Sequence, residues 1–304
     1  MPDEPKIIIR EVALRDGLQS EPEFVPTEKK IALVQALRRA GVKYLETTSF
    51  VSARAIPQLG DAAELMAGVP RKGLIHEVMM PNFKGAQAAI EAGADRLVVF
   101  VSASEAHNQA NVRRSISQSL TGLEAVFELA ESHEVPVAAV IAVAFGCPFQ
   151  GRVPKSDVLA IARRLARAGA RRITLADTTG LADPARIGKV VAFFKEHLPE
   201  TTFCLHLHNN RGIAMANLYA GYLAGITMFD TSLGGIGGCP NVPQAAGNLA
   251  TADVAFMFEA MGVPTGLDLA GLVQAAHLLE QTLQHPLPGQ VMKSGPAYTG
   301  DNFS

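Results

Sequence analysis

Apolar and polar positions along the chain follow two alternating rhythms. Short runs rich in β-branched and aromatic residues alternate with longer runs in which apolar residues recur at helical spacing. The predicted strands cover residues 7–12, 44–50, 74–80, 96–102, 137–145, 172–176, 203–208 and 228–233. The predicted helices cover residues 27–39, 57–67, 83–92, 112–132, 155–168, 184–197, 212–224 and 243–261.

The alternation itself indicates the fold class. Several predicted helices end on Ala-Gly before a strand, as in "RRAGVKYLE", which is typical of a glycine C-cap. Eight strand–helix units over about 260 residues predict an α/β protein, a (β/α)8 TIM barrel over residues 1–266. A further helix and a Pro/Gly-rich tail, residues 267–304, form a predicted C-terminal helical appendage packed on the barrel. An open doubly wound sheet is the competing interpretation, although no G-x-G-x-x-G follows the first strand.

Composition excludes several classes of partner. The chain of 304 residues is 48% hydrophobic and 18% charged, which predicts a large core and argues against disorder. A net charge of −2 without a basic stripe argues against nucleic acid. The longest apolar run, residues 135–145, is too short to cross a bilayer, so no membrane partner is expected. An odd number of cysteines and the lack of a signal-like N-terminus predict a cytoplasmic protein.

Ionisable residues gather at the predicted strand ends, where TIM barrels place their catalytic groups. His206 and His208 are two apart on a strand, so they face the same side and form a natural metal pair. Taken singly, the other charged groups could be structural, for example as a loop ion pair. Together they indicate a metal-assisted site; they are Arg15, Asp16, Glu46 and Asp177.

The glycine-rich segment "SLGGIGGCPNVPQAAGN", residues 232–248, follows the last predicted strand. Its glycine pairs permit positive φ and close backbone approach, and it carries Cys239 at the predicted active face. We interpret Cys239 as a functional thiol, and we place Asn248 in the helical run that follows. Cys147, with similar neighbours, ends the fifth predicted strand, while Cys204 within the seventh is interpreted as packing.

Four segments, "EVALRDGLQSE", "LETTSFVS", "HLHNNRGIAMAN" and "GGIGGCPNVPQAAGNLAT", together resemble the 3-hydroxy-3-methylglutaryl-CoA lyase family over residues 6–294. The resemblance implies Mg²⁺ or Mn²⁺ as cofactor, with zinc as the alternative. It implies a catalytic arginine, Arg15, a loop cysteine, Cys239, and acid–base or neighbouring carboxylates at Glu46 and Asp177. The implied metal ligands are Asp16, His206, His208 and Asn248, and the implied substrate-pocket residues are Gln19, Asn111, Thr174 and Thr178.

The activity implied by this resemblance is retro-Claisen cleavage of 3-hydroxy-3-methylglutaryl-CoA to acetyl-CoA and acetoacetate, as in leucine catabolism and ketone body formation. His206 or a carboxylate near the metal would take the hydroxyl proton, Arg15 would stabilise the enolate, and Cys239 would protonate it. An acyl-CoA substrate and a homo-oligomer are expected. Three alternatives stay open: a lyase for a related ester such as citramalyl-CoA, a condensing acyl transferase on the same barrel, and a non-catalytic CoA- or metal-binding protein. In the related condensing enzymes this loop resembles a Gly-Glu-Arg form, so the Gly-Gly-Cys-Pro sequence of this chain favours cleavage over condensation.

Overall fold

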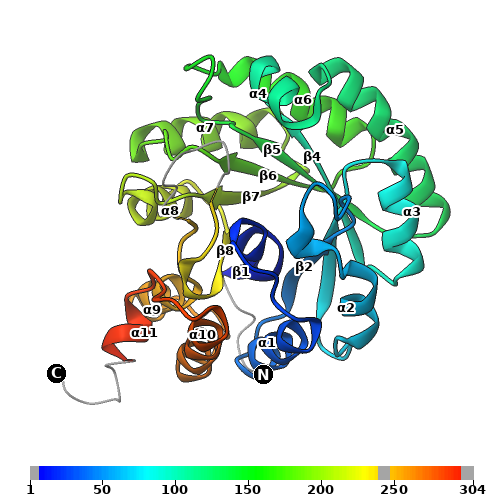
Figure 1. Cartoon of the computed structure of the whole chain (residues 1–304). Helices are drawn as coiled ribbons and strands as arrows, with labels where there is room; N and C mark the ends of the chain where they lie inside the picture. Colours follow the sequence, from blue (N-terminus) through cyan, green and yellow to red (C-terminus); the bar gives the residue numbers. More distant parts are fainter. Residues whose placement is uncertain (1–6, 239–246, 296–304) are drawn as a thin grey trace.

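A closed barrel of eight parallel strands forms the centre of the molecule (Figure 1). The computed structural model describes residues 7–238 and 247–295. β1 pairs with both β2 and β8, so the sheet has no open edge and the doubly wound alternative is wrong. The (β/α)8 prediction is confirmed. The strands are β1 (Ile8–Glu11), β2 (Tyr44–Ser49), β3 (Ile75–Met79), β4 (Arg96–Ser102), β5 (Val137–Ala142), β6 (Arg172–Asp177), β7 (Thr202–Leu207) and β8 (Met228–Thr231).

Helices surround the barrel and cover its outer face (Figure 1). On α1, Leu33, Val34 and Leu37 share one side and are buried against the strands, as helical spacing predicts. The helices are α1 (Thr27–Arg39), α2 (Ala62–Gly68), α3 (Phe83–Glu91), α4 (Glu105–Val112), α5 (Ile116–Ser132), α6 (Lys155–Arg167), α7 (Pro184–His197), α8 (Ala214–Leu223), α9 (Thr251–Ala260), α10 (Leu269–Leu283) and α11 (Val291–Ser294). Short helical turns are η1 (Ala13–Gly17), η2 (Leu18–Ser20), η3 (Pro57–Leu59) and η4 (Leu233–Gly235).

The predicted helix over residues 112–132 starts too early: it corresponds to α5, which begins at Ile116, whereas α4 before it was not predicted. α4 ends at Val112, and the C-cap residue Arg113 adopts a left-handed conformation with φ of 56°. α5 then starts from Ser115, whose side chain accepts a hydrogen bond from the Gln118 amide while the Gln118 side chain accepts one from the Ser115 amide. This capping box is written in the sequence as S-x-x-Q, a signal that apolar periodicity passes over. Similarly, the predicted helix at 57–67 begins with the separate turn η3.

The predicted helix over residues 243–261 begins too early. Of this stretch, 243–246 lie outside the described residues, and α9 starts only at Thr251. Asn248 forms a β-bridge with His208, and Ala250 forms one with Ser232. The segment before α9 therefore pairs with the carboxyl ends of β7 and β8 instead of coiling, so Asn248 does not lie in a helix.

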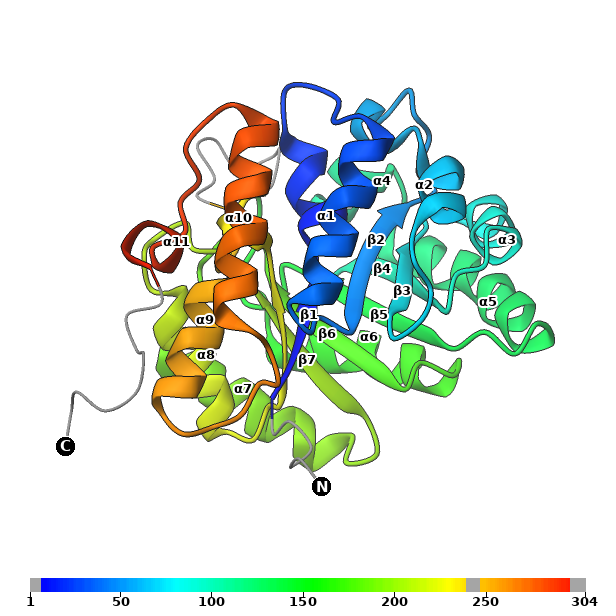
Figure 2. The ribbon, with the colours of Figure 1, turned by 90° about the horizontal axis from the view of Figure 1, so that it is seen from below.

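α10 lies lengthwise beside α1 on the outside of the barrel (Figure 2). Its buried side chains repeat at helical spacing and pack toward α1 and α9; they are Leu272, Ala275, Ala276 and Leu279. The placement of a boundary at residue 266 stays a prediction. Within the described ranges, no helix combines the length and apolarity needed to cross a membrane.

Candidate active site

At the carboxyl end of β1 the chain forms the π-helical turn η1, which buries Arg15 and Asp16. Glu11 anchors this turn by accepting hydrogen bonds from the Ala13 amide at 2.8 Å, the Leu233 amide at 2.8 Å and the Thr251 hydroxyl at 2.6 Å. Burial raises the pKa of Glu11 to about 7, although these donors favour the charged form. One carboxyl group thereby ties together the segments that follow β1 and β8.

Asp16, His206 and His208 converge in a buried cluster whose ligand atoms all lie within 4.8 Å of one another. The Nε2 atoms of the two histidines are 2.9 Å apart. Asp16 Oδ2 lies 3.8 Å from Nε2 of His206 and 3.6 Å from Nε2 of His208. The two imidazoles face the same side, as their spacing predicts, and His208 lies just beyond the end of β7.

Asn248 completes this cluster from the segment before α9. Its Nδ2 donates to Asp16 Oδ2 at 2.7 Å and to the Ile236 carbonyl at 3.1 Å, while its Oδ1 is buried without a hydrogen-bond partner. Gly237, with φ of 116°, allows the close approach, because a Cβ there would lie 2.6 Å from Asn248 Nδ2. A carboxylate and two imidazoles with ligand atoms within 4.8 Å of one another, and an Asn amide in contact with that carboxylate, fit a divalent cation.

Asp230, which was not among the predicted site residues, orients His206 by contacting its Nδ1 atom. Its Oδ2 lies 3.1 Å from His206 Nδ1, and it accepts two hydrogen bonds from Arg10, at 2.7 and 2.5 Å. Burial lowers the pKa of His206, but the hydrogen bond to Asp230 and the charges of Asp16 and Asp230 outweigh this and raise it overall. A carboxylate on the far nitrogen of a ligating histidine is a common way to fix its tautomer. The available signal was a charged residue inside an apolar strand, as in "IIIREV" and "TMFDTS".

Arg15 is held in place by two carboxylates. Its NH1 donates to Asp16 Oδ1 at 2.6 Å and its NH2 to Glu46 Oε2 at 3.0 Å. Burial lowers the pKa of Arg15, yet Glu46 and Asp16 more than compensate, so the guanidinium stays charged. Glu46 lies within β2, not at its end, and Arg10 NH1 lies 3.4 Å from it.

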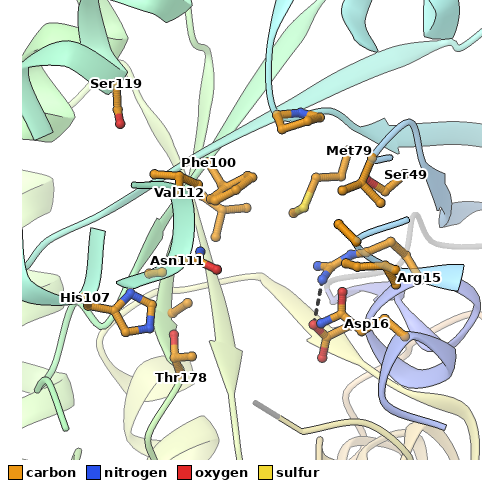
Figure 3. Close-up of a pocket in the computed structure, with 18 of the residues that line it drawn as sticks. Arg15, Asp16, Ser49, Met79, Phe100, His107, Asn111, Val112, Ser119 and Thr178 are labelled. Carbon is orange, nitrogen blue, oxygen red and sulfur yellow. Dashed lines mark hydrogen bonds and ion pairs between the residues drawn. The ribbon is translucent and has the colours of Figure 1, made fainter. Parts of the chain in front are cut away.

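A cavity of about 680 Å³ opens beside this cluster (Figure 3). Arg15, Asp16, His206 and His208 line one part of its wall, together with Gln19. His107, Asn111 and Thr178 lie across the cavity from Arg15 (Figure 3).

Four of the predicted site residues that the structure describes lie off the cavity wall, and Asn248 is one of them. Glu46 and Thr174 are fully buried inside the barrel. Asp177 ends β6 as predicted, but its carboxylate accepts hydrogen bonds from the Leu181 amide at 2.9 Å and the Ala182 amide at 3.0 Å. Cys239 lies outside the described residues. Gly238, next to it in the chain, lines the cavity.

β5 stops earlier than predicted, at Ala142, because Val143 adopts φ of 52°. A positive φ is strained for a β-branched residue, and such strain costs about 1–3 kcal/mol. Complete burial of Val143 and a 3.0 Å hydrogen bond from its amide to Thr178 Oγ1 hold it there. Cys147 consequently lies beyond the strand, in a bridge with Gly151. The Thr178 hydroxyl accepts from the backbone and keeps its own proton to donate.

Comparison with known proteins identifies the family. Residues 6–279 match the family model described as HMGL-like. The hydroxymethylglutaryl-CoA lyase YngG of Bacillus subtilis is 40% identical, with 97% of this chain and 100% of that protein covered. The (R)-citramalyl-CoA lyase of Chloroflexus aurantiacus is 37% identical, with 96% of each covered. A solved HMG-CoA lyase from Acenitobacter baumannii, in complex with coenzyme A and 3-methylmalate, superposes with a TM-score of 0.92 at 39% identity and covers 98% of each chain. The fold, the site and these matches agree: the chain belongs to the HMGL-like family.

Proposed function

We propose that this protein is a metal-dependent carbon–carbon lyase that cleaves 3-hydroxy-3-methylglutaryl-CoA to acetyl-CoA and acetoacetate. The observation that carries the proposal is the buried cluster of Asp16, His206 and His208 beside Arg15 at the wall of a large cavity. Similar proteins named as hydroxymethylglutaryl-CoA lyases support the choice of substrate.

Asp16, His206, His208 and Asn248 would hold Mg²⁺ or Mn²⁺. A divalent cation supplies Lewis acidity, which lowers the pKa of a substrate hydroxyl. The unpaired Oδ1 of Asn248 and the close approach of the two Nε2 atoms support this ligand set.

Arg15 is proposed to stabilise the enolate oxygen of the departing acetyl-CoA. Because Asp16 and Glu46 already fix its guanidinium, little reorganisation is needed when negative charge develops. The position of Glu46 behind Arg15 supports a positioning role for this carboxylate. The backbone contacts of Asp177 likewise support a role in holding the turn after β6.

His206 is proposed to take the hydroxyl proton. Its Nδ1 is engaged by Asp230, which stabilises the positive charge that the ring gains. Its Nε2 is therefore the atom that can accept the proton. A metal-bound Nε2 has no lone pair left for this, so His206 would act as the base only while it does not ligate the metal, and otherwise a carboxylate close to the metal would take the proton. Cys239 remains the proposed acid that protonates the acetyl-CoA enolate.

Gln19, Asn111 and Thr178 are proposed to contact the substrate from the cavity wall, and Thr174 to support the barrel beneath them. The coenzyme A complex of a similar enzyme supports an acyl-CoA substrate for this chain. We also propose a barrel domain over 1–266 with an appendage over 267–304, a homo-oligomeric assembly and a cytoplasmic location. Light scattering on the purified chain tests the assembly.

The decisive experiment is a coupled assay of acetyl-CoA release from 3-hydroxy-3-methylglutaryl-CoA. We expect turnover with Mg²⁺ or Mn²⁺, loss after chelation, and recovery when the metal is returned. Citramalyl-CoA is tested in parallel because a citramalyl-CoA lyase is a similar protein. Faster cleavage of citramalyl-CoA would reassign the substrate, net condensation of acetyl-CoA with a keto acid would indicate a transferase, and no metal-dependent turnover would indicate a binding protein.

A further inference from the structure

Part of the cavity wall is apolar and belongs to the inside of the barrel. Val98, Val140 and Ala176 form a small hydrophobic cluster, separate from the main core between barrel and helices. Met79 and Phe100 pack against it and remain only partly buried. Alternate residues of a strand point to the same face, so Val140 and Ala142 both face inward from β5. We call Met79, Phe100, Val140, Ala142 and Ala176, all of which line the cavity, the acyl lobe.

The acyl lobe combines small and flexible side chains with a lack of charge. Ala142 and Ala176 contribute only a methyl group each, and Met79 can change its rotamer to fit different shapes. Val112 and Leu123 add apolar surface elsewhere on the cavity wall. Figure 3 shows Phe100 and Met79 on the side of the cavity between Val112 and Arg15. The acyl lobe and Arg15 therefore line one and the same cavity.

A methyl group covers little of this surface. A longer alkyl group would bury more of it, and each buried methylene group stabilises a bound state by about 0.8 kcal/mol, or about fourfold in binding. The cavity volume of about 680 Å³ leaves room for such a group in addition to the rest of the acyl chain.

We propose that the acyl lobe receives the alkyl substituent on C3 of the substrate, and that the protein cleaves 3-hydroxy-3-alkylglutaryl-CoA esters with ethyl or propyl groups better than the methyl ester. This inference rests on the proposed lyase function. The chemistry is unchanged: the C2–C3 bond breaks, the hydroxyl loses its proton and becomes a ketone, and the electron pair passes to C2, which is protonated as acetyl-CoA. The alkyl group stays on the keto acid, so no further reactant is needed.

The test compares kcat/KM for the methyl, ethyl, propyl and butyl esters by acetyl-CoA release from the metal-loaded protein. For the wild type we expect a rise of up to about fourfold per added methylene until the lobe is filled. Val140→Phe and Ala142→Leu fill the lobe independently, and each should lower the propyl-to-methyl ratio at least tenfold. Leu223→Phe, at a site on α8 that is 68% exposed, is the matched control and should leave the ratio unchanged.

Each outcome bears on the inference. A steady fall in wild-type kcat/KM from methyl to propyl overturns it and leaves the proposed function standing. An equal loss of kcat/KM for all esters in both lobe variants also overturns the inference, because filling the lobe would then disturb the whole site and not only the binding of the alkyl group. If the wild type cleaves none of the esters, the proposed function fails and the inference fails with it. Thermal unfolding identifies a variant that does not fold, and the other lobe variant then supplies the ratio.

Discussion

Glu77, in the middle of β3, offers the sharpest test of the charged network inside the barrel. Its carboxylate accepts hydrogen bonds from Arg10 at 2.9 Å, from Arg96 at 2.7 Å and from Arg172 at 2.5 Å. Arg10 and Arg172 are themselves buried, and Arg10 also holds Asp230 beneath His206. Glu77→Gln would leave two buried guanidinium groups facing a neutral amide.

The structure sets the expected size of this effect. Burial raises the pKa of Glu77, but the charges of Arg10, Arg172 and Arg96 outweigh it and lower the pKa from 4.5 to about 2. That lowering corresponds to about 3 kcal/mol. Removing one partner of a buried ion pair typically costs about 3–5 kcal/mol, which agrees. We therefore expect the melting temperature of Glu77→Gln to fall by about 5–10 °C.

The assay is thermal unfolding followed by circular dichroism at several pH values. The control is Glu124→Gln. The side chain of Glu124 is 51% exposed and pairs at 2.6 Å with Arg164, which is 39% exposed. Such exposed ion pairs contribute less than about 1 kcal/mol to the free energy of unfolding. Since the folded pKa of Glu77 lies below its unfolded value, its stabilisation is complete above about pH 4.5 and is lost toward about pH 2. The difference between wild type and Glu77→Gln should shrink over the same interval. The reasoning would be refuted if Glu77→Gln were as stable as the control variant at pH 7, or if the difference in stability between wild type and Glu77→Gln did not change with pH.

Three further predictions concern the site. Arg15→Lys keeps the charge but loses the planar fork, so kcat should fall strongly with little change in KM, and near-normal kcat would reduce Arg15 to a loop ion pair. Asp230→Asn should weaken Mn²⁺ binding about 10–100-fold in a titration, because His206 loses its orienting carboxylate; unchanged affinity would contradict that role. Cys239→Ser should lower turnover by about 10²–10⁴-fold without changing the melting temperature, and early melting with normal turnover would contradict it. A thiol reagent should modify Cys239 before Cys204, whose thiol is fully buried and has a pKa raised by burial and by Asp230.

Apolar periodicity predicted the strands and most helices because barrel strands and their covering helices repeat a simple pattern of burial. It failed where a local signal interrupts the pattern. The capping hydrogen bonds of Ser115 with Gln118 start α5 later than predicted, and the left-handed Val143 ended β5 early. Asn248 was assigned to a helix because its neighbours are good helix formers, whereas pairing with His208 across the barrel mouth holds it in a bridge. Pairing between segments forty residues apart leaves no trace in a local window.

The sequence by itself determined the barrel, the family resemblance and the identity of the groups at the strand ends, because these depend on residue type and spacing alone. Only the tertiary structure decided which role each of those groups takes in the site. It brought Asp16, His206 and His208 together and placed the Asn248 amide against Asp16. It turned the carboxylate of Glu46 toward Arg15 and that of Asp177 toward backbone amides. It also revealed that Asp230 contacts Nδ1 of His206 and that Arg10 holds Asp230 in place. The physical reason is that a carboxylate's role depends on its burial and on which cation or amide lies within hydrogen-bond distance, and closure of the barrel sets both.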